Sequence, residues 1–173
     1  DALTLEVLDW QDNKLELFLP IQVNQSFTLL AVWAKHANSP TFAYIGQIWK
    51  YLQLHQLKMQ NIPLIIGGDF NSNSHWDVWD RWWNHSDVIR IFNDLKIKSL
   101  YHHISNEKQG QESQATFFLQ RNLAKAYHID YMFASEQFWK IDQASMQVGD
   151  QTPWLSLSDH LPLYFDLAPK FEK

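Results

Sequence analysis

The chain has 173 residues, 46% of them hydrophobic and 15% aromatic, so it is long enough to bury one substantial core. Its formal net charge of -5 argues against a protein that holds nucleic acid mainly by neutralising phosphates, and its lack of cysteine excludes disulfides, thiolate metal sites and a cysteine nucleophile. No segment approaches the ~18 apolar residues of a membrane span, so we expect one soluble domain over residues 1–173, with the cytoplasm as the default compartment.

The first part of the chain predicts strands followed by one long helix. Residues 3–10, 15–23 and 27–35 read as strands, with a turn at 11–13 between the first two, and the third is too continuously apolar for a surface element. Ser39 before Pro40 is a typical helix start, and the apolar residues that follow keep a helical period to about residue 61.

The rest of the chain predicts more strands than helices. Residues 63–68 read as a strand that turns at Gly68, and residues 75–93 as one or two short helices ending near residue 95. Further strands are expected around 99–102 and at 115–120, 128–135, 140–148 and 162–167. Strands flanked by a few helices predict α/β layers with mixed, largely antiparallel sheets.

Three motifs place a carboxylate at or near the end of an apolar strand. They are GDFNS at 68–72, HIDY at 128–131 and SDHLP at 158–162, with Asp69, Asp130 and Asp159 as their acids. Strand ends in layered α/β folds carry functional loops, and converging carboxylates repel each other unless a cation or a histidinium lies among them. Oxygen ligands favour Mg²⁺ or Mn²⁺.

Each motif also has a simpler interpretation when it is taken alone. The first could be an ordinary turn in which Asn71 bonds its own backbone. Asp130 could belong to a structural ion pair inside the sheet, because a buried acid needs a partner. Asp159 and His160 could form a turn before a strand that begins with proline.

Together and in this order, GGDFNSN, HIDYMFAS and SLSDHLPLYFDL resemble the three C-terminal signatures of the endonuclease/exonuclease/phosphatase family. FTLLAVWAKH resembles the central strand that ends in a functional histidine in many members, and the similarity runs from about residue 27 to 167. The resemblance implies a four-layer α/β/β/α sandwich and a metal-dependent phosphodiesterase, more typically a nuclease acting on DNA or RNA than a phosphatase.

The resemblance also implies roles for individual residues. Asp69 would orient or deprotonate the attacking water, and Asn71 would hold that water and the phosphate. His160 would contact the scissile phosphate, with Asp130 fixing its tautomer. Asp159 would help to bind the divalent ion, and His36 would be a further phosphate contact.

The chain departs from the family pattern at its beginning. Members start with an Asn-bearing strand and a second strand that ends in the main metal-binding Glu, and neither Glu6 nor Glu16 lies in that context. We therefore expect a sandwich without its first strands, weak Mg²⁺ binding, and self-association through an exposed sheet edge. An inactive relic of the fold that acts as a binding module is the alternative to a nuclease, and a phosphatase on a small ester is a further one.

Several other segments have two interpretations each. The tryptophans of residues 76–83 could stack on a substrate, although helically spaced aromatics more commonly belong to a core. His128 could line a cleft or simply pack. Residues 105–113 are polar and predict a mobile loop, and the remaining histidine pairs lack the spacing of a zinc site.

Overall fold

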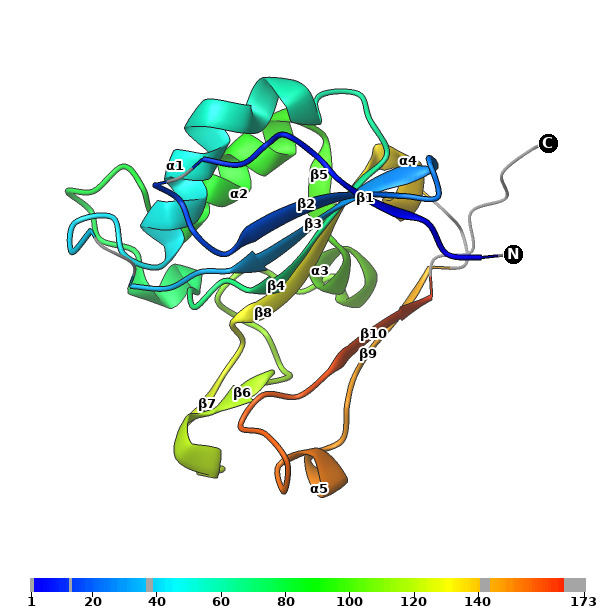
Figure 1. The fold of residues 1–173 in the computed structure, drawn as a ribbon. Coiled ribbons are helices and arrows are strands. Elements are labelled where there is room, and N and C mark those ends of the chain that lie inside the picture. Colours follow the sequence, from blue (N-terminus) through cyan, green and yellow to red (C-terminus); the bar gives the residue numbers. More distant parts are fainter. Residues whose placement is uncertain (1, 13, 37–38, 141–143, 167–173) are drawn as a thin grey trace.

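A computed structural model shows one six-stranded sheet, two small two-stranded sheets and short helices (Figure 1). It describes residues 2–12, 14–36, 39–140 and 144–166. The strands are β1 (Leu5–Val7), β2 (Phe18–Val23), β3 (Phe27–Trp33), β4 (Leu64–Asp69), β5 (Ile97–Ser99), β6 (Phe117–Phe118), β7 (Ala126–Tyr127), β8 (Asp130–Ser135), β9 (Ser145–Val148) and β10 (Leu163–Asp166). The helices are α1 (Ile45–His55), α2 (His85–Asp94), α3 (Leu100–Ser105), α4 (Glu136–Trp139) and α5 (Gln151–Trp154), with 3-10 turns η1 (Gln56–Met59), η2 (Ser74–Trp76) and η3 (Leu119–Arg121).

The strand order of the large sheet is β1-β2-β3-β4-β8-β5, and β9 pairs with β10 and β6 with β7. β3 and β4 run parallel, because the chain crosses back through α1 between them, and every other neighbouring pair in the large sheet is antiparallel. The predicted α/β class with mixed, largely antiparallel sheets is therefore confirmed.

Helices α1 and α2 cover one face of the sheet, where the main core lies (Figure 1). Tyr51 of α1 is fully buried, stacks on Phe18 of β2 with ring centroids 4.3 Å apart, and donates its hydroxyl hydrogen bond to the backbone oxygen of Trp10 (2.8 Å). The predicted helix start at Ser39 is wrong, because the chain first makes a turn and Tyr44 has a positive φ of 53° just before α1.

The other face of the sheet is covered unevenly. Near β8, helices α3 and α4 and strand β10 pack on it through a cluster that includes Ile65, Ala134 and Phe165. Towards β1, apolar side chains on this same face stay exposed, among them Val7 and Leu19. We call this uncovered part the open face.

The C-terminal half differs from the prediction in several places. Residues 100–102 belong to helix α3 and not to a strand, and the expected strand 115–120 is only two residues long before the 3-10 turn η3. The expected strand 140–148 begins only at Ser145, because Lys140 instead caps helix α4 and residue 144 is not in a strand. Residues 141–143 lie outside the described residues, as do Asn13 of the predicted first turn and Leu167 of the last strand. Within the described ranges, no helix is long and apolar enough to cross a membrane.

Candidate active site

The predicted acids Asp69 and Asp130 are cross-strand neighbours, at the end of β4 and the start of β8. Gly68, just before Asp69, has a φ of 140°, and a Cβ there would lie 1.9 Å from the carbonyl oxygen of Val32. Only glycine fits this conformation and this close approach of backbones. The glycine therefore lets β4 run tightly beside β3 until Asp69 emerges at the sheet end.

Asn71 holds the carboxylate of Asp69 from two sides. Its backbone N–H donates to Oδ1 (2.8 Å) and its side-chain Nδ2 to Oδ2 (2.6 Å), while Nδ2 also donates to the backbone oxygen of Ala34 (2.9 Å). Asn71 reaches this position with a positive φ of 46°. Both side-chain N–H groups are used, so the polar atom of Asn71 that remains for a ligand is the acceptor Oδ1.

The protonation of Asp69 is strongly affected by its surroundings. Burial raises the pKa of its carboxyl from 3.8 to about 6, and the charge of Asp130 adds to this increase. The hydrogen bond from Asn71 and the charge of His160 lower the same pKa but do not offset the increase. A carboxyl with this pKa is mostly ionised at neutral pH and can still take up a proton, which suits a general base.

His160 reaches Asp130 from the C-terminal segment. Its Nδ1 lies 3.1 and 3.0 Å from the two carboxylate oxygens of Asp130, so Nδ1–H donates and Nε2 is the nitrogen directed away from the carboxylate. This hydrogen bond raises the pKa of His160; burial opposes the increase, and the charges of Asp130, Asp69 and Asp159 strengthen it.

A short arm, residues 158–161, carries His160 and is held by the β6 segment. Backbone N of Phe118 donates to the backbone oxygen of Asp159 (2.8 Å), and backbone N of Leu161 donates to that of Thr116 (2.7 Å). Phe117 forms an isolated antiparallel bridge with His160. The arm thus places its histidine by backbone pairing.

The six predicted residues do not take part equally. Asp69, Asn71, Asp130 and His160 are joined by strand pairing and hydrogen bonds. Asp159 is half-buried and adjoins His160. His36 is exposed, two residues beyond the Ala34 carbonyl that Asn71 contacts, and its ring meets Tyr44 at 6.2 Å.

The site offers oxygen donors of the type that Mg²⁺ and Mn²⁺ prefer. However, among the residues that the structure describes, no three His, Asp or Glu side chains lie together in a way that could hold a metal ion. The repulsion felt by Asp69 from Asp130 shows two carboxylates placed close together. The oxygen donors at the site are therefore of the right type for such an ion, but those of the described residues are too few to hold it.

A buried polar network behind the site was missed from the sequence. Glu112 accepts hydrogen bonds from backbone N of Gly110 (2.9 Å) and Nδ2 of Asn73 (3.1 Å) and pairs with Nε2 of His102 (3.0 Å). Burial favours protonation of Glu112, but these hydrogen bonds outweigh it and lower its pKa to about 2. Segment 105–113, predicted as a mobile loop, is thereby tied to the residues that follow Asn71.

The tryptophan-rich segment does not form the core that its spacing favours. Trp79 is 95% exposed and Trp82 63% exposed, whereas Trp83 packs on Phe42 with ring centroids 4.7 Å apart. Residues 77–84 form turns and no helix, so the helical spacing of the tryptophans does not gather them on one face.

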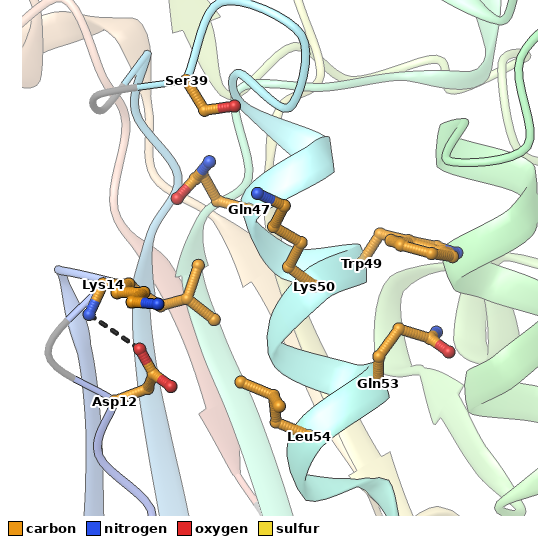
Figure 2. Close-up of a pocket in the computed structure, with 9 residues that line it drawn as sticks. Asp12, Lys14, Ser39, Gln47, Trp49, Lys50, Gln53 and Leu54 are labelled. Atoms are coloured by element: carbon orange, nitrogen blue, oxygen red, sulfur yellow. Dashed lines mark hydrogen bonds between the residues drawn. The ribbon is translucent and has the colours of Figure 1, made fainter.

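A separate hollow of about 610 Å³ lies along α1 and shares no residue with the predicted site (Figure 2). Gln47, Lys50 and Gln53 line it from the helix, facing Asp12 and Lys14 across it. Asp12 Oδ1 accepts a hydrogen bond from the backbone N of Lys14 (2.7 Å). This hydrogen bond lies within the turn itself, and the hollow is the space between that turn and helix α1.

No family model matches the sequence, and no curated protein matches it. Among solved structures, the chain is similar to NExo from Neisseria, a 3′ phosphatase bound to a product DNA hairpin, with a TM-score of 0.64 and 16% identity over 96% of this chain and 70% of that chain. It is similar to the endonuclease domain of TRAS1, a telomere-specific non-LTR retrotransposon, with a TM-score of 0.59 and 19% identity over 96% of this chain and 68% of that chain. The AP endonuclease LMAP from Leishmania major gives a TM-score of 0.59 and 11% identity over 88% of this chain and 55% of that chain.

These neighbours are nucleases and a phosphatase that share one architecture. The chain has the endonuclease/exonuclease/phosphatase fold, and the resemblance seen in its motifs is confirmed at the level of the fold.

Proposed function

We propose that the chain is a metal-dependent hydrolase of phosphodiester bonds and acts as a nuclease on DNA or RNA. The observation that carries the proposal is the Asp130–His160 pair, with its 3.0 Å hydrogen bond, beside Asp69 at one end of the sheet. A carboxylate near a histidine that is oriented by a second carboxylate supplies a base for water and a group for the phosphate.

In the proposed reaction, Asp69 accepts the proton of the attacking water, and Oδ1 of Asn71 helps to orient that water. His160 acts in its protonated form, which its raised pKa favours: Nε2–H donates to the scissile phosphate and stabilises its developing charge, while Nδ1–H donates to Asp130. As the water oxygen bonds to phosphorus, the P–O bond to the leaving sugar oxygen breaks, and that oxygen takes a proton from solvent. His36 is proposed as a further phosphate contact at the exposed side.

A divalent cation, Mg²⁺ or Mn²⁺, would stabilise charge on the phosphate oxygens when bound. Asp159 is the proposed ligand, together with oxygens of the carboxylates near it. Because the described donors are too few for a closed site, we expect weak cation binding by this chain.

The test is hydrolysis of plasmid DNA, abasic duplex, single strands and phosphate monoesters with Mg²⁺ or Mn²⁺. We expect cleavage of a nucleic acid, and a loss of roughly 100-fold or more in Asp69→Asn and in His160→Ala. Asp80→Asn, at an exposed acid elsewhere, is the matched control and should keep full activity. Activity that survives both site substitutions would refute the assignment, and cleavage of monoesters alone would favour a phosphatase.

A second candidate function is that of a binding module without catalysis. The open face favours it, because Leu5, Val7 and Leu19 expose apolar surface on one side of the sheet, which invites pairing with a second copy of the chain. Sedimentation velocity over a wide concentration range should then show a dimer that Leu19→Lys weakens. A monomer at every concentration would remove this candidate.

A further inference from the structure

Four aromatic rings form a continuous row that starts at the proposed catalytic histidine. The ring of His160 lies 4.6 Å from that of Phe117, which lies 6.3 Å from the ring of Tyr127 at an interplanar angle of 30°. Tyr127 in turn lies 5.5 Å from Trp76. The row connects the proposed phosphate site to the turn that follows the GDFNS motif.

The outer end of this row borders a recess of about 240 Å³. Trp76 and Tyr127 form its aromatic walls, and Gln114, Ala115 and His128 also line it. Aromatic faces combined with polar groups are typical of sites that take a flat heterocycle.

His128 lines this recess and has a buried ring nitrogen without a partner among the described residues. The ring is 5% exposed; its Nδ1 lies 2.7 Å from the backbone oxygen of Gln114 and therefore donates to it. Burial lowers the pKa of His128, so the ring is neutral and Nε2 is an acceptor. Nε2 is buried and has no hydrogen-bond partner among the described residues, and a buried acceptor without a partner costs free energy.

The exposure of the two walls also points to a ligand. Trp76 is 46% exposed and Tyr127 36% exposed, so part of each ring stays accessible to a ligand. The net charge of -5 disfavours binding mainly by phosphate neutralisation, and stacking on bases is a contribution that does not depend on that charge.

We propose that the recess lined by Trp76 and Tyr127 binds one unpaired base of the substrate, adjacent to the phosphate that His160 contacts. This inference rests on the proposed function and refines it, because it assigns the substrate to nucleotide chains with accessible bases and not to small phosphate esters. The base stacks on the exposed ring of Trp76 or Tyr127.

Binding can be measured without hydrolysis, by fluorescence anisotropy in EDTA at low salt. The probes are a short fluorescein-labelled thymidine homopolymer and an abasic oligomer of the same length. We expect the thymidine oligomer to bind more tightly, and Trp76→Ala to weaken it by about 5- to 150-fold while leaving the abasic oligomer unchanged. Trp76→Phe keeps a ring and should restore most of the affinity.

Trp79→Ala is the matched control, since Trp79 lies in the turn that follows η2, is exposed and does not line the recess. Its affinity for the thymidine oligomer should equal that of the unaltered chain, and far-ultraviolet circular dichroism establishes that each variant is folded. Equal binding of the two oligomers, undetectable binding of the thymidine oligomer, or an unchanged affinity in folded Trp76→Ala overturns the proposal. Because no metal and no cleavage are involved, the proposed hydrolysis can fail while base binding holds, and the reverse.

Discussion

Replacing Asp69 with asparagine should change how the stability of the fold depends on pH. The folded state raises the pKa of this carboxyl from 3.8 to about 6, so it holds the proton more tightly than the unfolded chain does. The resulting stabilisation is fully present below pH 3.8 and is lost as the pH rises through about 6. At neutral pH the ionised carboxylate therefore gives the fold no such stabilisation.

The size of the effect follows from the same pKa. A change from 3.8 to about 6 corresponds to about 3 kcal/mol, and solvent screening of this half-buried group reduces it to about 1–2 kcal/mol. Asparagine also loses one acceptor for Nδ2 of Asn71, which costs about 1 kcal/mol at every pH. The constant cost cancels when the pH dependence is compared.

The assay is equilibrium unfolding in urea, followed by the fluorescence of the nine tryptophans, at several pH values. The difference in unfolding free energy, Asp69→Asn minus the unaltered chain, should rise by about 1–2 kcal/mol between pH 4 and 6.5. Titration of His85, whose pKa burial lowers to about 4, occurs in both proteins and cancels. For Asp80→Asn, the difference in unfolding free energy from the unaltered chain should not change with pH. If the difference for Asp69→Asn does not change with pH either, the reasoning is refuted.

Three further predictions concern single residues near the site. Gly68→Ala should lower the unfolding free energy by more than about 2 kcal/mol, since its Cβ would meet a β3 carbonyl oxygen at 1.9 Å. Gly67→Ala should cost much less, with its nearest neighbour at 3.6 Å, and equal costs in urea unfolding would contradict this. Glu112→Gln should lower the unfolding free energy by about 2–4 kcal/mol near neutral pH. Because the folded state lowers the pKa of Glu112 to about 2, this loss of stability should shrink as the pH falls from 4.5 to 2. A loss of stability that stays constant over this pH range would count against the Glu112 network. Asp130→Asn should lower the pKa of His160 in an NMR titration of its ring protons, and an unchanged midpoint would sink the proposed pairing.

Much of the sheet could be predicted because its central strands are continuous apolar runs. β3, β4 and β8 were expected within two residues of their observed bounds at every end. Asp69 and Asp130 were expected at strand ends, and the pairing of these strands makes them neighbours. Motifs that are short and local in sequence carried this information.

Features that depend on distant contacts could not be predicted in this way. Asn73 and Glu112 are 39 residues apart and meet only through the packing of the loop on α3 and β8. The start of α1 follows the positive φ of Tyr44, which no capping pattern indicates. The exposure of Trp79 depends on a turn that replaces the expected helix, so its spacing was misleading.

The arm that carries His160 has a consequence for the dynamics of the molecule. A few backbone hydrogen bonds to the β6 segment hold the arm, whereas β3 and β4 lie inside a ladder of six strands. Segments held by few bonds open locally at a lower free energy than the global unfolding of the sheet. The backbone amides of Phe118 and Leu161 will then exchange with deuterium before those of β4. Asp130 and His160 can be paired only in molecules whose arm is docked, so the docked fraction sets the paired fraction.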